Sequence, residues 1–312
     1  MSQEYSFHQP VMLAEVLSFL PKKKKITYLD MTLGRAGHAS AILEKLSNGS
    51  TFYGVDRDEE ALSYSKKRLE VYEKNISLNY LHSTFSDAIP KLKKQGVTGV
   101  DFLLMDIGVS SPQFDDPKRG FSYRFDAPLD MRMNQEDSLT AKEIINTYSK
   151  EELIRVFRDL GECKDYYHVV EKILTVRQEK EISTTFELVD LIKENVSYQT
   201  LKKEGHPAKQ FFLGLRYEVN GEIAQLKKGL QEAISFLNSK GRLVIITFNS
   251  EEDKIVKDLF KSVTSSAHKD KYKTKDVEDY TLLTKKPLLP TQQEIEENHR
   301  AKPSILRALE RN

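Results

Sequence analysis

Short apolar runs alternate with helical patterns over the first third of the chain, and this alternation restricts the fold more than any other feature. Four apolar runs are typical of buried strands, and they span 26–31, 51–56, 77–82 and 100–106. Amphipathic patterns typical of helices cover 39–46 and 59–72. Because parallel strands are joined by right-handed crossovers, this order predicts an α/β fold with a mainly parallel, Rossmann-like sheet.

The alternation stops after Asp106 and resumes about a hundred residues later. The interruption begins with a loop rich in Pro, Asp and Gly, and then carries four helical patterns, at 141–148, 150–160, 167–179 and 185–195. Thr184 is the expected cap of the last helix. The pattern then predicts two helices, at 220–238 and 251–260, around a buried strand at 241–248. A further strand is expected over 279–284, and residues 304–310 fit either a strand or a helix.

The position of the interruption predicts three parts. We expect a first core segment at 1–109, an inserted helical domain at 110–210 and a second core segment at 211–312. The insertion leaves the sheet at the carboxyl end of a strand, which is the edge where open α/β sheets bind their ligands. An inserted domain there is well placed to cover a substrate.

A loop with two glycines, residues 30–38, joins the first strand to the first helix. Gly34 and Gly37 permit a tight turn and a close approach to a ligand. Asp56 ends the second strand, where an acid can accept hydrogen bonds from ribose hydroxyls. These features predict an adenosine-containing cofactor and fit both NAD and S-adenosylmethionine. The lack of a full G-x-G-x-x-G motif and the Asp30 before the turn favour S-adenosylmethionine.

The fourth strand ends in Asp106, and Ser110, Ser111 and Gln113 follow it closely. Methylation of an amino group requires the nitrogen lone pair to point at a sulfonium methyl group. Acceptors placed on the N–H bonds help to localise that lone pair, and no covalent nucleophile is needed. Asp106, Ser110 and Ser111 are therefore the catalytic candidates, although a lone Asp at a strand end is also typical of a turn cap.

The overall composition excludes a polycation and predicts no membrane partner. The net charge is +1, so an RNA substrate would have to be held by local basic patches. Two basic clusters lie near the two ends of the insertion, one at Arg119, Arg124 and Arg132 and one at Lys202, Lys203 and Lys209. The single cysteine gives no zinc motif, and no apolar run is long enough to span a bilayer, so we expect a cytoplasmic protein without a metal.

The residues after the fourth strand carry a resemblance to a known family. Residues 106–113, followed by RGFS at 119–122 and DAPLDMRM at 126–133, resemble the RsmH (MraW) family of bacterial 16S ribosomal RNA cytosine-N4 methyltransferases. Further matches cover nearly the whole chain, at 8–12, 30–38, 53–58, 206–208, 219–220, 247–248 and 300–302. The chain differs from the family pattern at Gln210, Leu213 and Asn249.

The resemblance implies a class I methyltransferase core that carries an inserted helical domain for RNA recognition. It implies S-adenosylmethionine as cofactor, with contacts from Ala36, Gly37, His38, Asp56, Phe85, Asp106 and Gln113. Phe85 fits a stacking role beside adenine and equally a place in the core. The candidates for substrate binding are Arg119, Arg124, Arg132, His206 and Lys209.

The implied substrate is a cytosine in the decoding region of 16S ribosomal RNA, within the small ribosomal subunit. Two other functions stay open, namely methylation of another nucleic-acid amino group by the same fold, and a cofactor-binding role in ribosome assembly without catalysis. Whether the chain forms a homodimer also stays open.

Overall fold

The computed structural model describes residues 10–264 and 279–312, with the side chains of Ser111 and Pro112 left out. The chain divides into two compact units. Unit 1 comprises Met1–Gly108 and Ala224–Asn312, and unit 2 comprises Val109–Ile223. Unit 2 therefore includes the whole of the predicted insertion at 110–210 and continues thirteen residues beyond its end.

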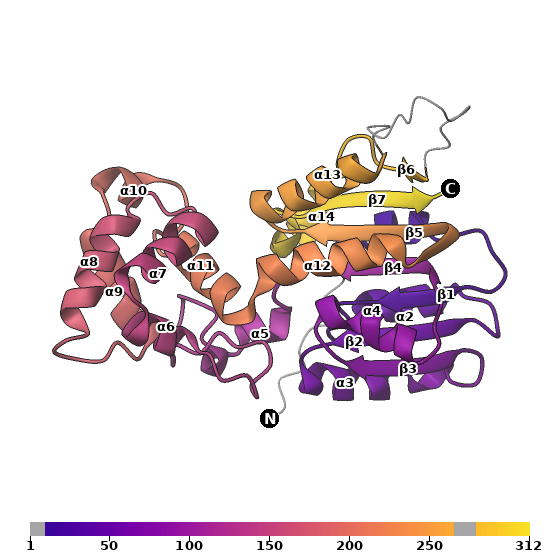
Figure 1. Ribbon diagram of the computed structural model, residues 1–312, viewed down its shortest axis with the longest axis horizontal. Coiled ribbons are helices and arrows are strands. Elements are labelled where there is room, and N and C mark those ends of the chain that lie inside the picture. The colour runs from indigo at the N-terminus through magenta and orange to yellow at the C-terminus, as the bar shows by residue number, and fades with distance from the viewer. Residues whose placement is uncertain (1–9, 265–278) are drawn as a thin grey trace. The chain divides into compact units, whose positions relative to one another are not determined.

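Unit 1 is built on one seven-stranded sheet, which Figure 1 shows with its strands side by side. The strands are β1 (Thr27–Asp30), β2 (Thr51–Asp56), β3 (Ser77–His82), β4 (Val100–Asp106), β5 (Leu237–Thr247), β6 (Tyr280–Leu282) and β7 (Ile305–Arg311). Their order is β3-β2-β1-β4-β5-β7-β6, with β1 to β5 parallel and β7 antiparallel to both of its neighbours. This arrangement confirms the expected class I methyltransferase core, and it makes residues 304–310 a strand rather than a helix.

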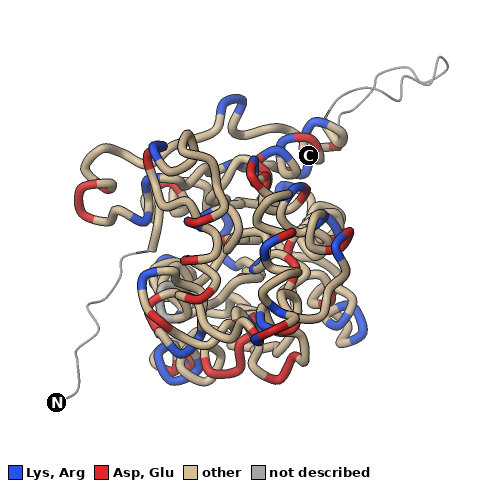
Figure 2. The backbone as a smooth tube through the Cα atoms, turned by 90° about the vertical axis from the view of Figure 1, so that its left-hand side faces the viewer, with Lys and Arg blue, Asp and Glu red and all other residues tan. Residues whose placement is uncertain are grey.

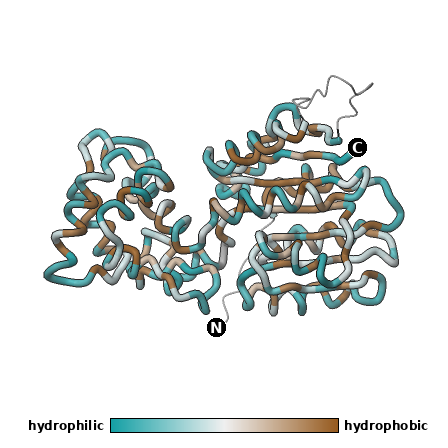
Figure 3. Tube along the Cα trace, in the orientation of Figure 1, coloured by the Kyte–Doolittle hydropathy of each residue, from teal (hydrophilic) through white to brown (hydrophobic). Residues whose placement is uncertain are grey.

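Helices cover both faces of this sheet because successive strand residues point to opposite sides. On β4, Leu103 packs with α4 (Phe85–Lys94), α12 (Glu222–Ser235) and α13 (Ser250–Thr264). The next residue, Leu104, packs on the other side with α1 (Leu13–Ser18), α2 (Gly37–Leu43) and α3 (Glu59–Leu69). Figure 3 shows the hydrophobic stretches of the central strands that this double covering requires. The remaining helical elements of unit 1 are η1 (Glu70–Tyr72), α14 (Gln292–Glu297) and η4 (His299–Ala301).

Unit 2 is helical and has a hydrophobic core of its own. Its elements are α5 (Ser111–Asp115), η2 (Pro117–Arg119), α6 (Ala141–Thr147), α7 (Lys150–Ile154), the π-helical turn η3 (Arg155–Leu160), α8 (Tyr166–Val176), α9 (Thr185–Asn195), α10 (Tyr198–Lys202) and α11 (Lys209–Asn220). Thr184 caps α9 as predicted and forms a capping box with Glu187.

The end of unit 2 contains one helix that the pattern did not predict. The helix expected over 220–238 is present as α12, from Glu222 to Ser235, whereas α11 was not predicted. Gly221, with a left-handed φ of 60°, separates the two helices. Phe211, Leu215 and Val219 of α11 belong to the core of unit 2, which explains why the unit extends past residue 210. No helix within the described residues is both long and apolar enough to cross a membrane.

Candidate active site

The loop between β1 and α2 is fixed by hydrogen bonds from the neighbouring elements. Leu33 donates its N–H to the carbonyl of Val55 (2.9 Å). The Gly34 carbonyl accepts a hydrogen bond from Ser65 Oγ (2.7 Å), and the Arg35 carbonyl accepts one from Arg68 Nη1 (2.8 Å). Strand β2 and helix α3 therefore hold the loop in one conformation.

The backbone of this loop is left-handed at two positions. Gly34 has a φ of 51° and the buried Ala36 has a φ of 58°. A left-handed alanine carries a cost of about 1–2 kcal/mol, and such strain is concentrated at functional sites. At Gly37, an added Cβ would lie 3.2 Å from Pro10 Cγ, so a side chain there would be crowded. These are the positions where the sequence predicts contacts from Ala36 and Gly37.

Asp56 connects this loop to the end of β2. Its Oδ2 accepts a hydrogen bond from Gly34 N (2.7 Å), and its Oδ1 accepts one from Asp58 N (2.9 Å). Burial raises the pKa of Asp56 to about 6 despite these bonds. Each carboxylate oxygen has a second lone pair, so Asp56 can orient the loop and still accept a hydrogen bond from a ribose hydroxyl.

Two carboxylates end the adjacent strands β1 and β4. Asp30 is buried and accepts hydrogen bonds from Tyr28 Oη (2.9 Å) and Thr32 N (3.1 Å). The Asp106 N–H donates to Thr32 Oγ1 (2.6 Å), so Thr32 connects the two strand ends. Burial raises the pKa of Asp30 to about 6.

Asp106 has an unusual environment for a carboxylate. Within the described residues no hydrogen-bond donor reaches its buried Oδ1, while Oδ2 lies 3.6 Å from His38 Nδ1. The Asp106 side chain is 27% exposed to solvent. Burial, followed by the negative charge of the buried Glu252, raises the Asp106 pKa to about 7. An unpaired buried acceptor beside a strained loop is what a bound donor group would satisfy, so these residues fit an aminoacyl-nucleoside cofactor.

His38 is buried at the start of α2, and its Nε2 lies 2.8 Å from the carbonyl oxygen of Val11. Burial lowers the pKa of His38. Phe85 begins α4 and packs closely on α12, where a Cβ at Gly229 would lie 2.8 Å from Phe85 Cδ2. Phe85 is thus a partly exposed member of the core of unit 1.

The remaining residues predicted beside Asp106 belong to unit 2. Gln113 is buried, and its Oε1 accepts a hydrogen bond from Ser110 N (3.3 Å). The side chain of Ser111 lies outside the described part of the structure. The catalytic role of the two serines and the cofactor role of Gln113 stay predictions.

Two of the residues predicted to contact RNA, Arg119 and Arg132, interact with other groups of unit 2, and their contact with RNA stays a prediction. Arg119 is buried, and its Nη2 donates to the carbonyls of Arg132 (3.0 Å) and Met133 (2.8 Å). Arg132 forms a bidentate ion pair with Asp130 (2.6–3.1 Å). Both guanidinium groups stabilise the loop before α6, because that loop has no regular backbone pairing of its own.

The other predicted substrate residues remain accessible. Arg124 and Lys209 are exposed. The His206 ring stacks on Tyr123 with centroids 4.4 Å apart, and its Nδ1 accepts a hydrogen bond from Ala208 N (3.2 Å). Figure 2 shows basic and acidic positions interspersed along the backbone, so individual residues rather than one large basic face would contact a phosphate chain.

Sequence reasoning missed Glu252 and Tyr123. Glu252 accepts a hydrogen bond from Phe248 N (2.9 Å) at the start of α13, and acids at helix starts are too common to mark a site. Tyr123 lies in a loop, and its partner His206 follows more than eighty residues later. No local pattern predicts such a pair.

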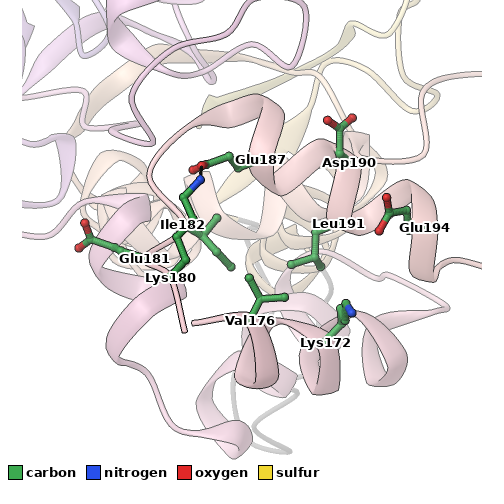
Figure 4. Close-up of a pocket in the computed structure, with 9 residues that line it drawn as sticks. All are labelled: Lys172, Val176, Lys180, Glu181, Ile182, Glu187, Asp190, Leu191 and Glu194. Carbon is green, nitrogen blue, oxygen red and sulfur yellow. Dashed lines mark hydrogen bonds and ion pairs between the residues drawn. The ribbon is translucent and has the colours of Figure 1, made fainter. Parts of the chain in front are cut away.

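A pocket of about 210 Å³ lies in unit 2 and is lined by residues of α8, α9 and the segment between them (Figure 4). Val176, Ile182 and Leu191 form its apolar part, and Lys180 pairs with Glu187 at its side. None of the predicted site residues lines this pocket. It is also smaller than the roughly 300–1,000 Å³ of typical ligand sites.

Comparisons with known proteins agree with the sequence resemblance. The model of the MraW methylase family matches residues 5–312. A protein of Spiroplasma kunkelii named ribosomal RNA small subunit methyltransferase H is 43% identical, over 97% of this chain and 98% of its own length. Proteins of the same name are 43% identical in Oenococcus oeni, over the full length of both chains, and 40% identical in Streptococcus mutans, over 97% of both.

Proposed function

Because the chain belongs to the MraW methylase family, we propose that it transfers a methyl group from S-adenosylmethionine to the N4 amino group of a cytosine in the decoding region of 16S ribosomal RNA. The match of the family model over residues 5–312 is the observation that carries this proposal. The names of the full-length relatives support the small-subunit RNA as the substrate. The resemblance of residues 106–133 supports the cytosine.

The site in unit 1 supplies the features that such a reaction requires. The rigid loop 30–38 and Asp56 would hold the cofactor, which supplies an electrophilic methyl group on its sulfonium sulfur. Asp106 is placed to accept a hydrogen bond from the amino group that is methylated, since its carboxylate has lone pairs that no donor among the described residues satisfies. Such an acceptor localises the nitrogen lone pair before transfer. RNA binding would fall to unit 2, where Arg124, Lys209 and the Tyr123–His206 stack are accessible or partly exposed.

The test is methyl transfer to small ribosomal subunits purified from a strain that lacks the modification. Mass mapping of the nucleosides should find one new methyl group on a cytosine N4 within the decoding region. A methyl group on another base would favour the alternative of a different amino-group substrate. Binding of S-adenosylmethionine without any transfer would favour a non-catalytic assembly protein.

A further inference from the structure

The tautomer of His38 is set by its hydrogen bond to the backbone. A carbonyl oxygen can only accept a hydrogen bond, so the Nε2 atom that lies 2.8 Å from the Val11 carbonyl must carry the hydrogen. In the neutral ring the other nitrogen, Nδ1, is then an acceptor. This acceptor faces Asp106 Oδ2 at 3.6 Å.

Two acceptors that face each other stabilise a proton placed between them. The distance of 3.6 Å is longer than a hydrogen bond, as expected for a pair without that proton. Other acidic side chains near the pair also favour a positive charge there. Asp30 from β1 and Glu294 from α14 act on His38, and Glu252 from α13 acts on Asp106. Tyr28 Oη donates a hydrogen bond to Asp30, and Glu294 accepts a hydrogen bond from Met12 N.

We propose that Asp106 accepts the proton that the methylated amino group must lose, and that His38 is a positioning residue whose Nδ1 then holds this proton in a hydrogen bond. The inference rests on the proposed methyl transfer. As the new N–C bond forms, the electrons of the S–C bond remain on sulfur and the amino nitrogen becomes positively charged. One N–H bond then breaks, its electron pair returns to nitrogen, and the proton forms an O–H bond with Asp106 Oδ2.

The pKa shifts of Asp106 and His38 agree with proton transfer from the amino group to Asp106. The pKa of Asp106 is raised to about 7 by burial, so its carboxylate is a far better base than an ordinary aspartate. Burial lowers the pKa of His38, so its ring stays neutral and keeps Nδ1 free to accept. The pair therefore stores one proton without creating a buried positive charge.

The test uses the variant His38→Leu, because leucine has no atom that can replace Nδ1 as an acceptor. Carbon-13 NMR of the Asp106 carboxyl in the cofactor-free protein should show its pKa falling by about one unit in this variant. Nitrogen-15 NMR of the wild type should show hydrogen on Nε2 of His38 above pH 8. The exposed His168, changed to leucine, is the matched control and should leave the Asp106 titration unchanged.

Single-turnover methyl transfer measured against pH supplies the second arm. The acidic limb of the rate profile should move to lower pH in His38→Leu by the same amount as the Asp106 pKa. An unchanged Asp106 titration, or hydrogen on Nδ1 in the wild type, would overturn the pairing even if methylation is normal. Absence of transfer by the wild type would overturn the proposed function, and with it the source of the proton, whatever the NMR arm shows.

Discussion

Three carboxylates, the buried Asp30 and the partly buried Asp56 and Asp106, dominate the site at the scale of single residues. Burial raises each pKa above that of the unfolded chain, to about 6 for the first two and about 7 for the third. The folded state therefore binds more protons between pH 4 and pH 7, and stability falls as the pH rises through the folded pKa values. Cofactor and substrate binding would offset this cost by supplying hydrogen-bond donors.

Replacement of Asp106 by asparagine should separate stability from activity. We expect Asp106→Asn to abolish methyl transfer and to raise the free energy of unfolding at pH 8 by about 1–3 kcal/mol, because a neutral amide needs no ionisation in the buried site. The greater stability of the variant should disappear as the pH is lowered from 8 to 4, because the Asp106 carboxyl of the folded wild type is protonated at pH 4. Urea unfolding at both pH values measures this. An equal gain in the free energy of unfolding at the two pH values would show that ionisation of Asp106 does not lower the stability of the wild type.

Replacement of Asp56 by alanine should weaken binding of S-adenosylmethionine. Loss of a charged acceptor for the ribose costs about 1.5–3 kcal/mol, or roughly 10- to 150-fold in affinity. Asp56→Asn should lie between the wild type and alanine, because it keeps one acceptor for Gly34 N or Asp58 N. Calorimetry on the folded variants gives the affinities, with the exposed Asp87→Asn as control. Unchanged affinity in Asp56→Ala would remove Asp56 from the cofactor site.

At the scale of elements, the capping residues of unit 2 do much to define its helices. Thr140, Ser149 and Thr184 each form a capping box with a glutamate three residues later. These boxes compensate for short helices that would be marginal alone. Thr184 also follows directly on a loop that pairs with Leu129, through the bond from Leu129 N to Ser183 O (3.0 Å).

The substitution Thr184→Ala should loosen α9 selectively. Loss of the cap costs about 1 kcal/mol, so the amides of α9 should exchange with solvent about five-fold faster. Ser149→Ala is the matched control, because it removes the same kind of cap from α7. Hydrogen exchange followed by mass spectrometry resolves the two helices. Equal acceleration of α7 and α9 by Thr184→Ala would indicate that unit 2 opens as a whole rather than at one helix.

The elements also show how far the sequence alone predicts this structure. The bounds of β2, β3 and β4 follow from their sequence patterns to the residue. The central strand β4 is buried on both faces and leaves a continuous apolar signal, whereas the edge strand β3 is only partly buried. Helix α11 was missed, and the helix predicted from residue 220 begins after Gly221, whose left-handed conformation ends α11. At the site, strand ends identified Asp56 and Asp106. The bonds of Arg119 to the carbonyls of Arg132 and Met133 depend on the path of an irregular loop, which no spacing reveals.

At the scale of the whole molecule, the chain has almost no net charge and is divided into two units. Unit 1 carries the acidic site, and it is assembled from two segments that flank unit 2. With a net charge of +1, attraction to RNA must come from a few accessible cations. Arg124 and Lys209 qualify, because both are exposed.

The double variant Arg124→Ala with Lys209→Ala should weaken binding to small ribosomal subunits and flatten its dependence on salt. Each lost phosphate contact lowers the slope of log K against log salt by up to about 1, while cofactor affinity should stay the same. The control is Arg158→Ala with Lys180→Ala, which removes two exposed cations that are already paired with Asp159 and Glu187. Titration at two salt concentrations measures the slope. An unchanged slope would place the RNA elsewhere.

Strand β7 lies between β5 and β6 in the sheet, although both precede it in the chain. During synthesis, β5 therefore emerges with one edge unpaired, and it stays so until residues 305–311 have been made. An exposed edge of that kind invites pairing with other chains. A chain interrupted before Ile305 should accumulate in aggregates rather than as a weakened enzyme. The sheet is therefore complete only after residues 305–311 have been synthesised.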